Sequence, residues 1–328
     1  MDRRESQIVL GLDPDPMQLW PIASGHAQET PGHAQPLSHA EPSSHAQEPP
    51  GYADEPSLRA VKSSGEASPA ARAAAAMRAH CLALIDAAGP ACVAVKPQLA
   101  RFEVLGAPGW AALEEVVAYA HAAGLLVIAD CKRGDIAETA RAYAQAMTGV
   151  TATPFGDVRG LGADMLTVNP LMGADAIEPF IATARRVGSG VLALVRTSNP
   201  GAADVEDLEL AGGGRVWERL AALVNRLGRE GVGESGLSDV GAVVGATAPE
   251  HLARARELMP RAVFLLPGVG AQGGRVEELA PAFLPGRAGG LVAASRSIAN
   301  AHVLRGEDPA AAARAEAERL RELAWQIS

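Results

Sequence analysis

The sequence predicts a (β/α)8 TIM barrel, a single domain in which eight parallel strands alternate with helices. Three observations predict it: eight short apolar runs, helix-like stretches between them, and polar residues where the runs end. Continuous apolar strands alternating with helices are typical of a parallel sheet covered by helices. Eight such units in 328 residues fit one barrel. A doubly wound open sheet is the alternative, but no strand is directly followed by a G-x-G-x-x-G fingerprint.

The expected elements follow in chain order from the apolar runs. Strands are expected at residues 8–13, 91–98, 125–132, 165–170, 190–198, 240–246, 262–268 and 291–297. Helices are expected at residues 109–124, 135–147, 174–188, 216–230, 249–259 and 309–327.

One segment, residues 21–70, interrupts this alternation after the first strand. It holds eight of the 23 prolines and four of the eight histidines, in a degenerate repeat GHAQ, GHAQ, SHAE, SHAQ. Histidines in a short repeat can bind a metal. The lack of apolar periodicity and the abundance of Pro, Ser, Gly, Gln and Glu instead favour a disordered, low-complexity insertion within the single domain. A long loop of this kind costs little stability, because closure entropy grows only logarithmically with length.

Composition excludes several classes of protein. The net charge of −9 argues against nucleic-acid binding, which requires a basic surface. No apolar stretch approaches the roughly 20 residues of a membrane span, and the N-terminus has too short an apolar run for a signal peptide. Three cysteines without a pattern fit a reducing compartment better than a disulfide framework. We therefore expect a soluble cytoplasmic protein that binds neither nucleic acid nor membrane.

Charged residues gather at the end of the third strand, in IADCKRGDI (128–136). Side chains alternate along a strand, so Asp130 and Lys132 are expected to point the same way, towards the barrel axis and Lys96. Asp135 is expected to open the next helix, where the helix dipole favours a carboxylate. An ordinary solvated turn with a helix cap is the alternative. A lysine held between carboxylates stays charged, which suits a general acid rather than an amine nucleophile.

The loops after the seventh and eighth strands suggest a phosphate site. Barrels often bind phosphate in these two loops, which here read PGVGAQGG (267–274) and SRSIAN (295–300). Glycine amides can approach an anion closely, Gln272 can donate to it, and Arg296 can bind it in a fork geometry. A glycine-rich turn beside a surface arginine is the alternative.

These residues resemble the orotidine 5′-phosphate decarboxylase family, and most closely its longer bacterial branch. The motifs that carry the resemblance are GLDPDP, AVKPQLARFEVLG, IADCKRGDI, TVNPLMGADAIEPF, RTSNPGA, VVGATAPE and PGVGAQGG. D-x-K-x-x-D alone is moderately specific, whereas the seven motifs in this order are highly specific. The resemblance covers the barrel from Ile8 to roughly Asn300 and implies decarboxylation of orotidine 5′-phosphate to UMP without a cofactor or metal.

The resemblance also implies catalytic roles. Lys132 matches the lysine that protonates C6 of the pyrimidine as carbon dioxide leaves. Asp130 matches the carboxylate beside the departing group, and Lys96 matches the lysine that orders the charged row and contacts the ribose. Asp135 matches an acid that reaches into the partner's site in a homodimer with shared active sites, and Thr139 matches a residue that accompanies it.

For substrate binding, the resemblance implies four further contacts. Asp13 would contact the ribose, Ser198 the pyrimidine edge, and Gln272 with Arg296 the phosphate. One departure affects this set, because the chain has SR at 295–296 where the family more often has GR.

Two competing functions remain open. Magnesium-dependent sugar-phosphate decarboxylases and aldolases of the same suprafamily share D-x-K-x-x-D, but they carry an acidic metal ligand at the second strand. This chain has Lys96 there, and an ammonium group would repel the cation. The other competitor is a non-catalytic nucleotide-binding barrel. The intact D-x-K-x-x-D motif argues against that loss of activity.

Overall fold

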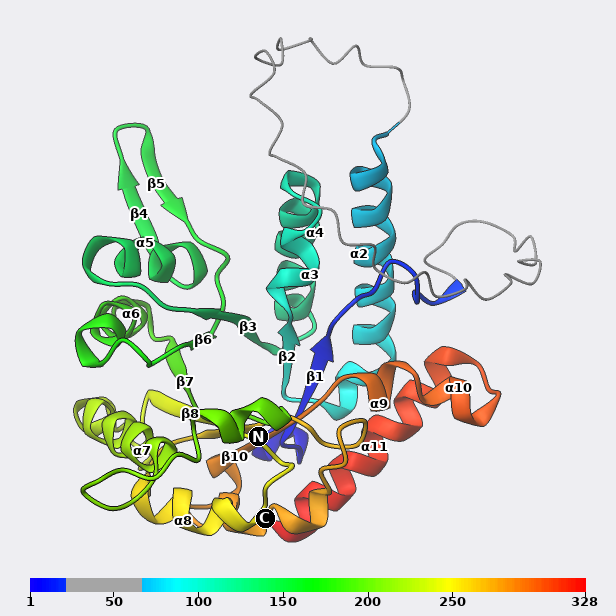
Figure 1. Cartoon of the computed structure of the whole chain (residues 1–328). Helices are drawn as coiled ribbons and strands as arrows, with labels where there is room; N and C mark the ends of the chain where they lie inside the picture. Colours follow the sequence, from blue (N-terminus) through cyan, green and yellow to red (C-terminus); the bar gives the residue numbers. More distant parts are fainter. Residues whose placement is uncertain (22–66) are drawn as a thin grey trace, which may run out of the picture.

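The computed structural model describes residues 1–21 and 67–328, and these form the predicted barrel (Figure 1). Eight parallel strands close in the order β1-β10-β9-β8-β7-β6-β3-β2. They are β1 (Ile8–Leu12), β2 (Ala94–Pro97), β3 (Leu126–Arg133), β6 (Met165–Val168), β7 (Gly190–Arg196), β8 (Val240–Val244), β9 (Phe264–Leu266) and β10 (Gly290–Ala294). Each overlaps one predicted run, so the predicted fold class is confirmed.

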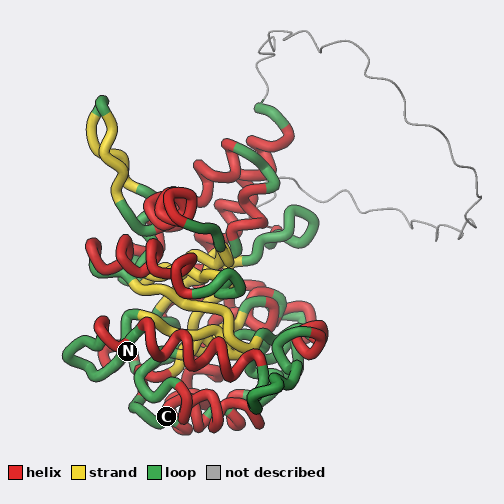
Figure 2. The backbone as a smooth tube through the Cα atoms, turned by 60° about the vertical axis from the view of Figure 1, so that its left-hand side comes forward, coloured by secondary structure: helices red, strands yellow, loops and turns green. Residues whose placement is uncertain are grey.

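Helices surround the strands, as Figure 2 shows. The longer ones are α2 (Pro69–Ala88), α4 (Ala107–Ala122), α5 (Ala137–Met147), α6 (Ala174–Val187), α7 (Val216–Leu227), α8 (Glu250–Leu258) and α11 (Pro309–Ile327). Short helices α3 (Leu99–Glu103), α9 (Arg296–Ala299) and α10 (Ala301–Arg305) follow strand ends or connect longer helices. Among residues 1–21 and 67–328, no helix is both long and apolar enough to cross a membrane.

Strand alternation divides the core into two layers. In β1, Ile8, Leu10 and Leu12 belong to the large apolar cluster between strands and helices. Val9 belongs to a second cluster inside the barrel, together with residues such as Ile128. Because successive side chains point to opposite faces, the inward series that starts at Val9 continues towards the carboxyl end of the strand. Apolar side chains therefore fill the interior of the barrel, and a cavity lies at the carboxyl ends of the strands.

Helix α2, which is not among the predicted helices, begins within the segment that the sequence assigns to the insertion. Ser68 caps α2, since its hydroxyl accepts the backbone N–H of Ala71 at 3.2 Å, and Pro69 occupies the first turn. Residues 67–70, which the sequence assigns to the insertion, thus lead into and begin a regular helix. The predicted disorder and the histidine repeat (His26, His33, His39 and His45) fall in residues 22–66, outside the described residues.

A two-stranded antiparallel hairpin lies between α5 and β6 and is not predicted by the sequence. It consists of β4 (Val150–Thr153) and β5 (Gly156–Arg159), and it projects away from the barrel (Figures 1 and 2). Seven of its eight strand residues are exposed, and so is Phe155 at its turn. No apolar run marks it, because neither face packs into the core.

Candidate active site

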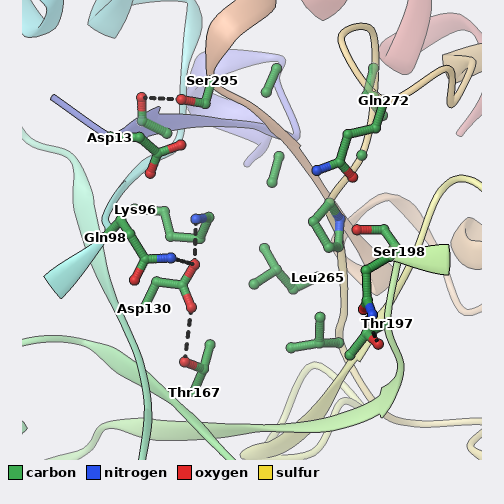
Figure 3. A pocket seen from close by; sticks show the side chains of 18 of the residues that line it. Asp13, Lys96, Gln98, Asp130, Thr167, Thr197, Ser198, Leu265, Gln272 and Ser295 are labelled. Atoms are coloured by element: carbon green, nitrogen blue, oxygen red, sulfur yellow. Dashed lines mark hydrogen bonds and ion pairs between the residues drawn. The ribbon is translucent and has the colours of Figure 1, made fainter. Parts of the chain in front are cut away.

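A cavity of about 490 Å³ opens at the carboxyl ends of the barrel strands. Every one of the eight strands, or the loop that follows it, contributes to its lining. This is the end of the barrel where parallel strands bring their polar termini together. Figure 3 shows Lys96, Gln98 and Thr167 gathered around Asp130 on one side of the cavity, with Ser198 on the opposite side.

Three charged side chains form a continuous row at this mouth. Lys96 Nζ donates to Asp130 Oδ2 at 2.6 Å, and Lys132 Nζ donates to Asp130 Oδ1 at 2.5 Å. Lys96 and Asp130 are buried, whereas the Lys132 side chain is 46% exposed. The row therefore runs from a buried ion pair to an ammonium group that is open to the cavity. The predicted meeting of these three residues is confirmed.

Two neutral residues complete the bonding of Asp130. Thr167 donates its hydroxyl to Asp130 Oδ1 at 3.1 Å, and Gln98 Nε2 lies 3.3 Å from Asp130 Oδ2. Each carboxylate oxygen thus has two donors. The sequence does not single out either residue, although Gln98 stands two positions after Lys96 and Thr167 lies on β6, so strand alternation could have placed both at the mouth.

Lys132 reaches this position through an unusual backbone conformation. Its φ is +44°, a left-handed value that is rare for a lysine. The register between β3 and β6 shifts between Ala129 and Arg133, so β3 bulges there. The Thr167 hydroxyl accepts the N–H of Cys131 at 3.0 Å and of Lys132 at 2.9 Å. The bulge, rather than regular alternation, aims Lys132 at Asp130.

Electrostatics fix the charge states within the row. Burial alone would raise the pKa of Asp130, but the ammonium groups of Lys96 and Lys132 and their hydrogen bonds lower it to about 2. Burial lowers the pKa of Lys96, but the carboxylates of Asp130 and Asp13 outweigh it, and the net pKa is raised. At neutral pH, Asp130 is therefore a carboxylate and Lys96 an ammonium ion.

The four residues expected to bind substrate line the same cavity: Asp13, Ser198, Gln272 and Arg296. Asp13 Oδ1 is buried and has no hydrogen-bond partner among the described residues, so it is available as an acceptor. The loop that carries Gln272 turns through Gly268 and Gly270, whose φ values of +102° and +76° favour glycine.

Asp135 and Thr139 lie outside this cavity. Asp135 does not open α5, as the sequence suggests, because the helix begins at Ala137 with Ile136 as its N-cap. Its Oδ1 instead accepts the Ile136 N–H at 2.8 Å in the loop before the helix. Thr139 is exposed on the first turns of α5. Neither residue is brought to the charged row of its own chain.

Comparison with known proteins identifies the family. The sequence profile of the "Orotidine 5'-phosphate decarboxylase / HUMPS family" matches residues 56–315. An orotidine 5′-phosphate decarboxylase of Deinococcus radiodurans is 47% identical over 242 residues, which cover 74% of this chain and 82% of that protein. The chain belongs to the orotidine 5′-phosphate decarboxylase family.

Further relatives agree with this assignment. An orotidine 5′-phosphate decarboxylase of Rhodopirellula baltica is 44% identical over 229 residues, covering 70% of this chain and 74% of that protein. The solved structure of Leishmania donovani OMP decarboxylase superposes with a TM-score of 0.63 at 29% identity, covering 98% of this chain and 96% of that one.

The departure from the orotidine 5′-phosphate decarboxylase pattern at position 295 has a local explanation. Ser295 packs against Gly11 of β1 and donates its hydroxyl to the Gly11 carbonyl at 3.3 Å. A Cβ at Gly11 would stand 2.5 Å from the Ser295 Cβ, so there is no room for a side chain on both strands. The serine is accommodated because the neighbouring strand has a glycine.

Cys131, between two members of the charged row, is partly buried and packs against the apolar core. Burial raises the pKa of its thiol, which is therefore protonated at neutral pH. Its Sγ lies 3.4 Å from the Thr167 carbonyl.

Within residues 1–21 and 67–328, no cluster of three His, Cys, Asp or Glu side chains could hold a metal ion.

Proposed function

We propose that this chain decarboxylates orotidine 5′-phosphate to UMP and carbon dioxide, with no metal or cofactor, and that Lys132 supplies the proton. The observation that carries the proposal is the row Lys96–Asp130–Lys132 at the mouth of the barrel, in a chain that belongs to the orotidine 5′-phosphate decarboxylase family.

The chemistry requires both charge stabilisation and a proton. When the bond from C6 to the carboxylate breaks, carbon dioxide leaves and the electron pair stays on C6, in the plane of the ring and without a conjugated sink. The ammonium group of Lys132 would stabilise this pair and then transfer one N–H proton to C6. The neutral amine would regain a proton from water. The exposure of Lys132 to the cavity supports this role.

Asp130 would act before bond breaking. Its carboxylate is ionised and cannot move away from the substrate carboxylate, since four donors hold it. Two carboxylates side by side repel each other, and loss of carbon dioxide relieves that repulsion. Lys96 would keep Asp130 ionised and contact the ribose. An ammonium ion at position 96 also disfavours a metal at this site, which argues against the magnesium-dependent branch of the suprafamily.

The remaining cavity residues would hold the substrate away from the reacting carbon. Gln272, Arg296 and the glycine loop 267–274 would bind the phosphate, Asp13 the ribose and Ser198 the pyrimidine edge. Binding energy from the phosphate would then hold the base against the charged row.

We also propose a homodimer with shared active sites. Of the sixteen large apolar side chains that are exposed among the described residues, seven lie on α5, the hairpin, the loop before α5 or the loop after β6. They are Ile136, Tyr143, Val150, Phe155, Val158, Leu171 and Met172. An exposed two-stranded hairpin is marginal in water without a covering surface. A second copy packed here would cover these side chains and bring its Asp135 and Thr139 towards the neighbouring cavity.

A turnover assay tests the proposed function. Purified protein with orotidine 5′-phosphate and EDTA is expected to yield UMP, followed by the change in ultraviolet absorbance. Turnover that is lost on chelation and restored by magnesium would support the metal-dependent alternative. Binding of UMP without turnover would support the non-catalytic nucleotide-binding barrel.

A further inference from the structure

The loop after β7 contains a carboxylate that no role above explains. Glu206 lines the cavity, and its side chain is 17% exposed. It accepts the backbone N–H of Thr197 at 2.8 Å, and its two oxygens lie 3.1 and 3.3 Å from the Thr197 hydroxyl. That hydroxyl also lies 2.7 Å from Asn199 Oδ1. One carboxylate thus holds Thr197 through both its backbone and its side chain.

Glu206 is itself firmly anchored. Its carbonyl accepts the N–H of Trp217 at 2.9 Å, in the first turn of α7. The adjacent Asp207 accepts two hydrogen bonds from Arg196, at 2.9 and 2.8 Å, at the end of β7. The bidentate Arg196–Asp207 pair closes the base of the loop, and Glu206 adds only a longer contact to it, with Oε2 at 3.9 Å from Arg196 Nη1. Loss of the Glu206 side chain would therefore free the N–H and the hydroxyl of Thr197, whose carbonyl stays bound to Arg196, without opening the loop.

Ser198, the next residue, is packed so tightly that its orientation depends on its neighbours. A Cβ at Gly245 would stand 2.8 Å from the Ser198 Cα, and one at Gly268 would stand 3.2 Å from its Cβ. On its other side, the Thr247 hydroxyl donates to the Ser198 carbonyl at 3.1 Å. Glu206 holds the N–H and the hydroxyl of Thr197, and Thr247 holds the peptide after Ser198. The carbonyl of the peptide between Thr197 and Ser198 accepts from Arg196 Nη1 at 2.6 Å.

We infer that Glu206 is a positioning residue for recognition of the pyrimidine base. This inference rests on the proposed function, in which Ser198 faces the pyrimidine edge. A uracil edge alternates acceptors and donors, so a polar side chain discriminates it only when its direction is fixed. Glu206 fixes that direction through Thr197. The ribose and phosphate contacts, Asp13, Gln272 and Arg296, come from other strands and do not depend on it.

Binding of two ligands by calorimetry separates this role from a structural one. UMP carries the base, and ribose 5-phosphate lacks it. Glu206→Ala is expected to weaken UMP binding about tenfold, the effect of losing roughly 1.4 kcal/mol of interaction. The same variant should bind ribose 5-phosphate as wild type does. Glu206→Gln keeps an oxygen acceptor for the Thr197 N–H and should restore most of the UMP affinity.

Glu209→Ala is the matched control, because Glu209 is an exposed glutamate in the same loop, and it should change neither affinity. Equal weakening of both ligands by Glu206→Ala, or none, would overturn the inference, as would failure of Glu206→Gln to restore UMP binding. If Glu206→Ala does not fold, Glu206→Gln and Glu206→Asp are compared by the same ratio of affinities. Wild-type protein that does not bind UMP would overturn the proposed function itself. If the wild type turns over substrate but Glu206→Ala leaves the ratio of the UMP and ribose 5-phosphate affinities unchanged, this inference alone would be overturned.

Discussion

Lys132 is held in a left-handed backbone conformation that would relax without support. For a residue with a Cβ, such a conformation costs about 1 to 2 kcal/mol. Thr167 opposes the relaxation, since its hydroxyl accepts the N–H groups of Cys131 and Lys132 and donates to Asp130. The hydroxyl of Thr167 therefore contacts both Asp130 and the backbone of Lys132.

Thr167→Val tests this support, because it keeps the shape of the side chain and removes the hydroxyl. We expect kcat to fall about 100-fold or more, as for loss of one preorganised donor in a catalytic site. Affinity for UMP should change much less, since the phosphate, ribose and base contacts lie elsewhere. Steady-state kinetics give kcat, and Thr167→Ser is the control that should retain it. Wild-type kcat in Thr167→Val would show that the bulge holds without the hydroxyl.

His80 makes stability depend on pH. Its Nδ1 accepts the backbone N–H of Trp20 at 3.1 Å. Burial, and to a smaller extent the nearby His302, lowers the pKa of His80 from 6.5 to about 4. A histidine with a lowered folded-state pKa binds its proton more readily when unfolded. The folded protein therefore loses stability as pH falls from about 6.5 towards 4, by up to about 3 kcal/mol.

His80→Asn removes the titration while its Oδ1 can still accept the Trp20 N–H. Urea unfolding between pH 4 and pH 7 should show a shallower loss of stability in the variant than in wild type. Parallel curves over this range would mean that His80 does not titrate with a lowered pKa.

Individual site residues differ in how far the sequence could predict them. Lys96, Asp130 and Lys132 stand at strand ends in a motif, so their meeting follows from the barrel geometry. Thr167 and Glu206 could not be predicted in their roles, because these arise from contacts between segments 9 to 37 residues apart in the chain. Hydrogen bonds of this kind leave no periodic pattern in the sequence.

Among the secondary-structure elements, the β4–β5 hairpin is one that the sequence does not predict. Its strands are four residues long and exposed, so the alternation that marks a half-buried strand is missing. Phe155 at its turn is 99% exposed. An apolar ring in this position suits a surface that a second copy covers.

Phe155→Ser together with Val158→Ser should weaken self-association without unfolding the barrel. We expect the dimer dissociation constant to rise about tenfold or more, since burial of an aromatic ring contributes up to about 3 kcal/mol. Sedimentation velocity over a concentration series measures it. Val303→Ser, an exposed apolar residue of α10 on another part of the chain, is the control. An unchanged dissociation constant would place the interface elsewhere.

For the whole molecule, the eight strands and their order along the chain follow from apolar runs and the helices between them. Closure of the barrel brings their carboxyl ends together, which explains why Asp13, Ser198, Gln272 and Arg296 line one cavity. Asp135 shows the limit of this reasoning. Its place in the motif does not bring it to its own cavity, and a contact between two chains cannot be deduced from the fold of one.

Complementation tests the shared site. Lys132→Ala and Asp135→Ala homodimers should each be nearly inactive. In a heterodimer of the two, one site carries both lesions and the other carries neither, so activity should recover to about half of wild type. Differently tagged chains, co-expressed and purified as heterodimers, provide the measurement. An inactive but correctly folded heterodimer would mean that both residues serve the site of one chain.

The most direct test of the central claim, that Lys132 protonates C6 as carbon dioxide leaves, is turnover by Lys132→Ala, measured beside product analysis in deuterated water. The Lys132 ammonium exchanges its protons with solvent, so orotidine 5′-phosphate should be converted to UMP that carries deuterium at C6, seen in the proton NMR spectrum as loss of the H6 signal. Lys132→Ala should bind UMP but form product at least about a hundredfold more slowly. Undiminished turnover by Lys132→Ala, or UMP formed in deuterated water with hydrogen at C6, would contradict the claim.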